Sequence, residues 1–355
     1  MSTAVSPHSK PGPQADAWTD KMTKKQPRAA VIGAGACGLT AARDLAAQGW
    51  SVEVFEKSRG IGGRLAAKRI PDLGTVDLGA QFITANTAEF AELLRTAATR
   101  TLIALWQGRI AYFNDRQREL AKPQERWVGV PSMNAWLVEL WPRQSIRFEA
   151  RIDHIQRRSD GQWVLNDRHE DGFDTVVLAM PPLQAAALAS GTSLEAPLRD
   201  MIMTPCWAGL VLFAEALAVD FDAAFIRGGE LDWLANHRSK PDRTHHPAAW
   251  TIHAGASFSA QLSHEPQESV APLLMAALAT TLGGTLPPGD VALTHFWRYA
   301  APLAGAVPGI FWDPKIGLGA GGDWSIGGRV EGAFIAGKSL AASICRDRGS
   351  WAEMT

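Results

Sequence analysis

The chain has 355 residues, of which 46% are apolar, and its 35 basic and 36 acidic side chains give a formal net charge of -1. A chain of this size can bury a substantial core and is expected to form about two domains. Its balanced charge offers no basic surface for nucleic acid or an anionic membrane. We therefore expect a small-molecule partner and neither nucleic acid nor membrane; the sequence leaves the oligomeric state open.

The three cysteines, Cys37, Cys206 and Cys345, are far apart and form no CxxC pair. This pattern favours neither a disulfide framework nor a structural zinc site, and we predict no metal. No apolar run approaches the roughly 20 residues of a membrane-spanning helix. The N-terminus also lacks the basic-then-apolar order of a secretory signal. These features predict a cytoplasmic protein.

Residues 1–27 are rich in Pro, Ser, Lys and Ala and contain few large apolar residues. Such a composition predicts a disordered N-terminal extension. A short regulatory or targeting arm is the alternative. Met22 precedes the first predicted strand, so a start at this residue would still give the complete fold.

The first folded segment has the pattern of a βαβ unit. A strand over residues 28–33, a helix over 37–48 and an alternating strand over 51–55 follow one another. Further along, residues 146–157 and 162–166 are predicted as two strands of a hairpin, joined by a Ser-Asp-Gly turn. The sequence FDTVVLAMPP then predicts a buried strand that ends at two prolines.

The second half of the chain is rich in predicted strands. Several strand-like runs occupy residues 204–264, a helix is expected over 266–283, and another strand over 289–300. The sequence GLGAGGDW predicts a strand end with a glycine turn, and a closing helix starts at residue 332. The stretch SKPDRTHHP, residues 239–247, is interpreted as a solvated, proline-bounded loop.

The glycines of VIGAGACG have the spacing of a dinucleotide-binding turn. Gly33 permits a sharp exit from the strand, Gly35 permits close approach of a pyrophosphate, and Gly38 permits helix and strand to pack closely. The helix N-terminus then presents free N–H groups to the phosphates. Glu56 ends the second strand, where a carboxylate accepts hydrogen bonds from ribose hydroxyls and repels a 2′-phosphate. The pattern favours NAD or FAD over NADP.

A second glycine-rich stretch, RGIGGR at residues 59–64, follows about twenty positions later. Its free backbone at Gly62 and Gly63, beside Arg64, suits a second pass along an extended pyrophosphate. This element favours FAD, because one turn suffices for a nicotinamide dinucleotide.

From about residue 28 to 346 the chain resembles the FAD-dependent amine oxidase superfamily and, within it, the renalase-like flavoproteins of bacteria. The resemblance is carried by VIGAGACGLTAARDL, VFEKSRGIGGR, VDLGAQFIT, RWVGVPSMNAW, DTVVLAMPP, HFWRYA, and GDW followed by GRVEGAF. It implies non-covalent FAD bound near Gly33, Gly35, Ala36, Cys37, Gly38, Glu56, Lys57, Gly62, Gly63, Arg64, Gly79, Ala80, Gln81, Phe82, Ile152, Gly322, Asp323, Gly332 and Ala333.

The resemblance also assigns roles to several of these residues. Asp323 would hold the flavin-side phosphate or ribityl chain, Ile152 would meet the adenine through its backbone, and residues 79–82 would lie near the isoalloxazine ring. Gly332 and Ala333 would begin the last helix, whose N-terminal dipole can stabilise negative charge on the reduced ring. Cys345 has no flavin-attachment context.

The expected fold is α/β (α+β overall), with a Rossmann-type FAD-binding domain interleaved with a strand-rich, mixed-sheet substrate domain. Residues 28–83, 126–183 and 291–350 are assigned to the FAD-binding domain, and residues 84–125 and 184–290 to the substrate domain.

The resemblance implies an FAD-dependent oxidase that takes hydride from dihydropyridine isomers of NAD(P)H to flavin N5, and passes electrons to O₂ to give NAD(P)⁺ and hydrogen peroxide. No catalytic side chain is assigned, because this chemistry has no obligatory general base. Candidate pocket residues are His253, Trp297 and Tyr299. One alternative is an amine oxidase acting on a small primary amine or polyamine; another is a flavin-binding protein without turnover.

Overall fold

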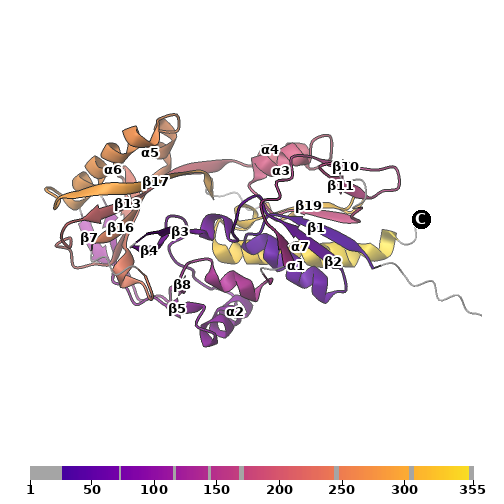
Figure 1. The fold of residues 1–355 in the computed structure, drawn as a ribbon, viewed down its shortest axis with the longest axis horizontal. Helices are drawn as coiled ribbons and strands as arrows, with labels where there is room; N and C mark the ends of the chain where they lie inside the picture. The colour runs from indigo at the N-terminus through magenta and orange to yellow at the C-terminus, as the bar shows by residue number, and fades with distance from the viewer. Residues whose placement is uncertain are drawn as a thin grey trace, which may run out of the picture.

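The computed structural model describes residues 26–71, 73–114, 117–142, 145–167, 172–243, 248–303 and 308–351. The predicted N-terminal extension lies outside these ranges, apart from its last two residues. Figure 1 shows an elongated molecule with one sheet at each end and the C-terminal end of the last helix remote from the larger sheet. Among the helices described, none is long and apolar enough to span a membrane.

The smaller main sheet has six strands in the order β18-β19-β12-β1-β2-β9 and is parallel except at its β18 edge. Its central strands are fully buried apolar runs, as expected for a parallel sheet covered on both faces. The strands are β1 (Arg28–Ile32), β2 (Ser51–Phe55), β9 (Ile146–Arg147), β12 (Thr175–Leu178), β18 (Phe311–Asp313) and β19 (Leu318–Ala320).

Two helices, α1 (Ala36–Ala47) and α7 (Val330–Trp351), pack together against one face of this sheet (Figure 1). Their approach is close, because a Cβ placed on Gly337 would lie 2.3 Å from the carbonyl oxygen of Cys37. A second apolar core covers the other face. It includes residues of α3 (Pro182–Leu188), α4 (Glu195–Arg199) and the antiparallel hairpin of β10 (Ile155–Arg157) and β11 (Trp163–Leu165).

The larger sheet has seven strands in the order β17-β13-β16-β15-β14-β6-β7. One face is covered by α5 (Ala256–Gln261) and α6 (Gln267–Leu282), with Trp207, Trp250 and Leu274 in the core between them. The strands are β6 (Ile110–Asn114), β7 (Gln117–Leu120), β13 (Met203–Phe213), β14 (Ala223–Arg227), β15 (Leu231–Asn236), β16 (Ala249–Ala254) and β17 (Gly289–Pro302).

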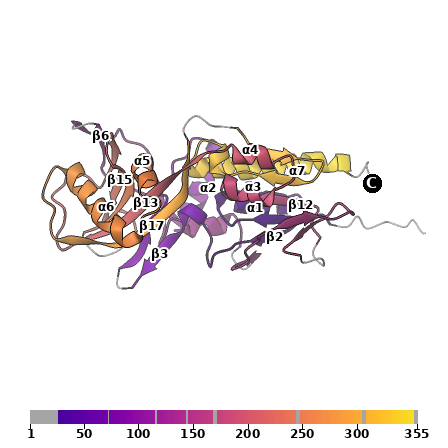
Figure 2. The ribbon, with the colours of Figure 1, turned by 90° about the horizontal axis from the view of Figure 1, so that it is seen from above.

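Two long strands connect the ends of the molecule. Both β13 and β17 run from the seven-stranded sheet toward the six-stranded sheet (Figure 2). Short elements lie between the sheets: the hairpin β3 (Ala67–Ile70) and β4 (Gly74–Asp77), helix α2 (Ala88–Thr99), the pair β5 (Ile103–Leu105) and β8 (Trp127–Gly129), and the 3-10 helices η1 (Gly63–Leu65), η2 (Ala135–Glu139), η4 (His237–Ser239) and η5 (Asp323–Ser325).

The predicted fold class is confirmed, and the predicted βαβ unit matches β1, α1 and β2 within one residue. The prediction of one strand over residues 146–157 is wrong. Residues 146 and 147 form β9 and join the parallel sheet beside β2, whereas only Ile155–Arg157 pairs with β11. The chain changes sheets between these strands, which an apolar pattern alone does not reveal. The last helix starts at Val330, two residues before the predicted start.

Candidate functional site

The first glycine turn joins β1 to α1 and leaves open space above one glycine. Gly33 has a φ of +112°, and a Cβ there would lie 2.3 Å from the oxygen of Ala179. A Cβ on Gly38 would lie 2.0 Å from the oxygen of Gly33. Around Gly35, by contrast, a Cβ would meet no atom within 4 Å. Packing therefore requires the first and third glycines, whereas the second borders space that the described residues do not fill.

The second glycine element is hydrogen-bonded to the first. The Gly62 N–H donates to the oxygen of Ala34 at 2.9 Å, and Gly62 and Gly63 have φ of +119° and +54°. A Cβ on Gly63 would also meet nothing within 4 Å. The predicted pair of turns is thus one continuous backbone surface with open space over Gly35 and Gly63.

Glu56 directly follows β2 and is 8% exposed. Its Oε2 accepts from the Ala34 N–H at 2.9 Å, and its Oε1 accepts from the N–H and the hydroxyl of Ser58 at 2.9 and 2.7 Å. A carboxylate has about four acceptor positions, so one remains available on Oε2. Neighbouring Lys57 is exposed. Glu56 therefore holds the glycine turn and retains capacity for one further donor.

Ile152, the predicted adenine contact, lies close in space to the carboxyl end of β2. It borders a small cavity of about 30 Å³ together with Phe55, Asn166 and Phe173. The Ala150 N–H donates to the oxygen of Glu56 at 2.9 Å, which holds this segment against the strand end.

Arg64 and Asp323 form an ion pair across 259 residues of sequence. Arg64 Nη1 donates to Asp323 Oδ2 at 2.9 Å and to the oxygen of Ala300 at 3.0 Å, and Nη2 contacts Oδ1. Burial, followed by the charge of Asp323, raises the pKa of the Cys37 thiol, so Asp323 also lies near the first glycine turn. The pair brings the second glycine element and the GDW segment together, and Arg64 offsets a carboxylate that would otherwise repel a phosphate.

Residues 78–82 are held by contacts from η1 and from the seven-stranded sheet. The Ala80 N–H donates to the oxygen of Arg64 at 2.9 Å, and a Cβ on Gly79 would lie 2.0 Å from the same oxygen. The Leu78 carbonyl faces His253 Nε2 at 2.9 Å and accepts from Trp297 Nε1 at 3.0 Å. The predicted pocket residues His253 and Trp297 therefore anchor Leu78, the residue directly before residues 79–82, the predicted flavin segment.

Burial, only partly offset by the bond to Leu78, lowers the pKa of His253 to about 4. The imidazole is therefore neutral at pH 7, and its Nε2–H donates to the carbonyl. Tyr299, the third predicted pocket residue, lies two positions beyond Trp297 on β17 and is half-buried.

The predicted residues at the start of α7 lie in its first turn. A Cβ on Gly332 would lie 2.0 Å from the oxygen of Ile326, so the preceding loop packs directly on the helix. Glu331 accepts from the N–H groups of Asn86 and Thr87 at 2.9 and 2.7 Å, which joins α7 to the start of α2.

The expectation of a solvated loop at residues 239–247 is wrong for Lys240 and Arg243, which are 3% and 7% exposed. Arg243 Nε donates to Asp77 Oδ2 at 2.9 Å, and Lys240 Nζ lies 3.6 Å from the same oxygen. Asp77 is the last residue of β4 and lies two positions before residues 79–82, the predicted flavin segment. His245 and His246 lie outside the described residues.

This ion cluster, Asp77 with Lys240 and Arg243, also holds Gln81. Lys240 Nζ donates to Gln81 Oε1 at 2.9 Å, while Gln81 Nε2 donates to the oxygens of Asp77 and Gly79 at 2.7 and 3.0 Å. Burial is the main cause that lowers the pKa of Lys240 to about 8, with Asp77 opposing it. Sequence patterns did not indicate this cluster; the only signal was two basic residues beside a proline.

A group of aromatic rings lies beyond the same segment. We call it the aromatic cluster; Phe82 and Phe225 lie in it with ring centroids 6.1 Å apart, and Phe82 and Trp233 are 5.5 Å apart. Arg126 packs beside it, with its guanidinium 5.5 Å from the Phe82 centroid. The cluster consists of Phe82, Trp106, Tyr112, Phe225 and Trp233.

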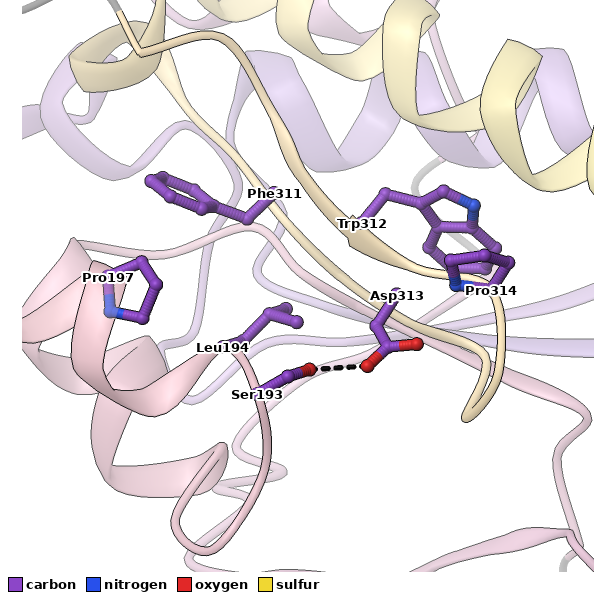
Figure 3. Close-up of a pocket in the computed structure, with 7 residues that line it drawn as sticks. All are labelled: Ser193, Leu194, Pro197, Phe311, Trp312, Asp313 and Pro314. Carbon is purple, nitrogen blue, oxygen red and sulfur yellow. Dashed lines mark hydrogen bonds between the residues drawn. The ribbon is translucent and has the colours of Figure 1, made fainter.

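A cavity with a volume of about 340 Å³ lies between α4 and β18. Figure 3 shows it lined by seven residues, with the Ser193 hydroxyl bonded to Asp313. None of the predicted site residues lines this cavity.

Residues 31–97 match the family model of the NAD(P)-binding Rossmann-like domain. This match covers both glycine elements and ends in α2. Two Arabidopsis thaliana proteins also match. A lysine-specific histone demethylase 1 homolog 3 is 51% identical over 59 residues, and a flavin-containing monooxygenase, FMO GS-OX3, is 27% identical over 146 residues.

These two matches cover 17% and 41% of this chain but only 4% and 31% of the two plant proteins. The chain therefore matches less than a third of the length of either plant protein.

Solved structures match over nearly the whole length of both chains. A candidate protoporphyrinogen oxidase from Exiguobacterium sp. 255-15 aligns with a TM-score of 0.69 at 14% identity, over 90% of this chain and 99% of that one. Cyclohexylamine oxidase from Brevibacterium oxydans IH-35A has a TM-score of 0.64 at 16% identity, over 91% and 100%. A wild-type putrescine oxidase bound to putrescine aligns with a TM-score of 0.61 at 12% identity, over 90% of this chain and 99% of that one. The chain has the fold of these oxidases.

Proposed function

We propose that this protein is a renalase-like FAD-dependent oxidase that takes hydride from dihydropyridine isomers of NAD(P)H and passes the electrons to O₂, giving NAD(P)⁺ and hydrogen peroxide. The observation that carries FAD binding is the continuous backbone surface of the two glycine turns, with open space over Gly35 and Gly63. A nicotinamide dinucleotide would need only the first turn.

The residues present fit FAD. The start of α1 and η1 would hold the pyrophosphate, the free acceptor position of Glu56 suits a ribose hydroxyl, and Asp323 would accept a hydrogen bond from the ribityl chain. Its ion pair with Arg64 neutralises the Asp323 carboxylate, so this carboxylate does not repel a phosphate group. When bound, the flavin accepts a hydride and returns two electrons to oxygen.

The side chains around residues 78–82 have positioning roles. His253 and Trp297 fix the Leu78 carbonyl, and Lys240 fixes Gln81, so the segment predicted to face the ring is rigid before substrate arrives. Oxidation of a dihydropyridine produces an aromatic pyridinium without releasing a proton, so holding the donor carbon over the ring is sufficient. The neutral state of His253 is consistent with this requirement.

The amine oxidase alternative is supported by the fold, which is shared with cyclohexylamine and putrescine oxidases. A flavin-binding protein without turnover is the third possibility. Adding candidate substrates to the purified yellow protein separates the three. Bleaching of the flavin by 2- or 6-dihydronicotinamides but not by amines supports our proposal; bleaching by amines alone favours the second, and no bleaching by either favours the third.

The placement of FAD is tested by Gly35→Val. Because a Cβ at Gly35 meets no protein atom within 4 Å, the variant is expected to fold normally but to purify without yellow colour. Gly60→Val is the matched control, since its Cβ also meets nothing within 4 Å and Gly60 is not among the predicted FAD contacts. Visible absorbance measures loading and circular dichroism measures folding. A fully loaded Gly35→Val protein would contradict the placement.

A further inference from the structure

Arg126 is a buried cation without a carboxylate partner among the described residues. It is 6% exposed and directly precedes β8. Its Nη1 makes one long contact, 3.4 Å, with the oxygen of Gln124, and its Nε has no hydrogen-bond partner. A buried charge normally has a counterion, because desolvation costs several kcal/mol. Arg126 therefore lacks the anionic partner that a buried guanidinium usually has, and a bound ligand could supply it.

The groups beside Arg126 come from one face of the seven-stranded sheet. Tyr112 of β6 is paired with Phe225 of β14, Phe225 with Trp233 of β15, and Trp233 with His253 of β16. Residues directly opposite on neighbouring strands share a face, so these four side chains form a row. The row ends at His253, which contacts the Leu78 carbonyl. The aromatic cluster and the predicted flavin segment thus share one surface.

Like Arg126, one residue of this row has a buried donor without a partner among the described residues. Trp233 is 5% exposed, and its Nε1–H makes no hydrogen bond. Burial lowers the pKa of Arg126, while the charge and a hydrogen bond of the Tyr112 side chain oppose this change, so the phenol oxygen lies beside the guanidinium and accepts from it. Two buried donors without partners in one aromatic cluster indicate a missing acceptor.

The charge around the aromatic cluster is positive. Lys240 Nζ lies 5.5 Å from the ring centroid of Trp106, on the side toward Gln81, but Asp77 balances it. No described carboxylate balances Arg126. An ammonium group placed here would be repelled, whereas an oxyanion would supply the missing charge and the missing acceptors.

We propose that Arg126, with the Tyr112 hydroxyl and Trp233 Nε1–H, binds the oxyanion of a flat substrate, a carboxylate or phosphate, whose ring packs against the half-buried rings of Phe82 and Phe225. This substrate class rests on the proposed function, because the site adjoins the segment predicted to face the flavin. It favours an anionic heteroaromatic substrate over a cationic amine. Arg126 binds and orients the substrate, and takes no part in hydride transfer.

Four benzene derivatives of similar size provide the test. Benzoate and phenyl phosphate carry the two oxyanions, benzamide is neutral, and benzylamine is a cation. Isothermal titration calorimetry measures each on the purified protein. We expect one or both oxyanions to bind at least 10-fold more tightly than benzylamine, and the tighter one to identify the substrate's group. Arg126→Met should weaken oxyanion binding by about 10- to 100-fold and benzamide binding only slightly.

Two further variants provide controls. Arg126→Lys keeps the charge and should restore part of the oxyanion affinity, which a purely structural role would not explain. Arg227→Met removes a charge from the exposed end of β14 and should leave every affinity unchanged. With dihydronicotinamide substrates, Arg126→Met should raise KM while kcat changes little.

Equal oxyanion binding by wild type and Arg126→Met, or tighter binding of benzylamine than of either oxyanion, would overturn the inference. Because calorimetry does not depend on flavin, failure of the proposed function is recognised separately, as lack of FAD uptake with oxyanion binding intact.

Discussion

Two regions beside the same segment bury cations, and they differ in what accompanies the charge. In the ion cluster, Lys240 and Arg243 share the carboxylate of Asp77, which is 1% exposed. Beside the aromatic cluster, Arg126 is 6% exposed and thus as buried as Arg243, which is 7% exposed. Arg126 has no carboxylate beside it among the described residues. Burial alone therefore does not distinguish a structural cation from a binding one. The two kinds of cation differ in whether the donors of the buried cation all have hydrogen-bond acceptors in the protein.

The ion cluster has the bonding of a structural unit. Arg243 donates to Asp77 and also to the carbonyls of Gly129 and Pro131, both at 2.7 Å, so the guanidinium is almost fully bonded. Although burial alone would raise the pKa of Asp77, the charges of Lys240 and Arg243 hold it below its usual value. The cluster joins β4, the loop after η4 and the loop after β8, and so fixes the start of the predicted flavin segment.

The largest effect is expected for Asp77→Asn. This change leaves Lys240 and Arg243 buried without their counterion, which typically costs about 3–5 kcal/mol. Urea unfolding at pH 7 measures the loss of unfolding free energy. Arg126→Met is the matched variant, because it removes a buried charge that has no carboxylate partner among the described residues; its stability should change by less than about 1 kcal/mol or increase. Similar losses in both proteins would erase the distinction between the two regions.

A smaller effect, dependent on pH, is expected from His237, which is fully buried beside the ion cluster. Burial, reinforced by Lys240 and Arg243 and opposed by Asp77, lowers its pKa from 6.5 to about 3. Between these values the unfolded chain binds a proton that the folded protein does not. Stability from this residue is therefore complete above pH 6.5 and decreases as the pH falls toward 3.

The variant His237→Gln removes this titration. From pH 7 to pH 5 the wild-type free energy of unfolding should fall by about 2 kcal/mol more than that of the variant. Urea titrations of both proteins at the two pH values measure this difference. Parallel decreases would mean that His237 is protonated in the folded protein, and would contradict its neutral state beside Lys240 and Arg243.

The difference between the regions also explains what sequence reasoning could predict. The first glycine turn was predicted correctly because Gly33 to Gly38 and the flanking β1 and α1 are contiguous in the sequence. Gly33 and Gly38 also have a steric reason, since a Cβ on them would lie 2.3 and 2.0 Å from a backbone oxygen. The ion cluster joins Asp77 to Arg243 across 166 residues. Nothing near either residue shows the pairing, so residues 239–247 had the composition of an exposed loop.

The aromatic cluster was missed for a related reason. Tyr112, Phe225 and Trp233 lie on three strands, and β14 pairs with β6 in parallel although more than 100 residues separate Phe225 from Tyr112. Strand order, which the sequence does not state, puts them in one row. Likewise His253 and Trp297 were assigned to a pocket from resemblance alone, whereas their bonds to the Leu78 carbonyl came only from the structure.

The smallest effect is expected for Trp233→Phe. The indole N–H has no partner, so its removal costs no hydrogen bond and avoids burying an unsatisfied donor. The phenyl ring retains most of the contact with Phe225, whose centroid is 4.6 Å away. Unfolding free energy should therefore stay within about 1 kcal/mol of wild type.

Oxyanion affinity should nevertheless fall, by about 2- to 10-fold, because one of the three proposed donors is lost. Calorimetry with benzoate and phenyl phosphate measures this, and the benzamide affinity shows whether the ring contact has survived. If Trp233 served only to fill the core, the variant would bind both oxyanions as wild type does. A decrease confined to the oxyanions would instead show that a donor left without a protein partner has its partner in the substrate.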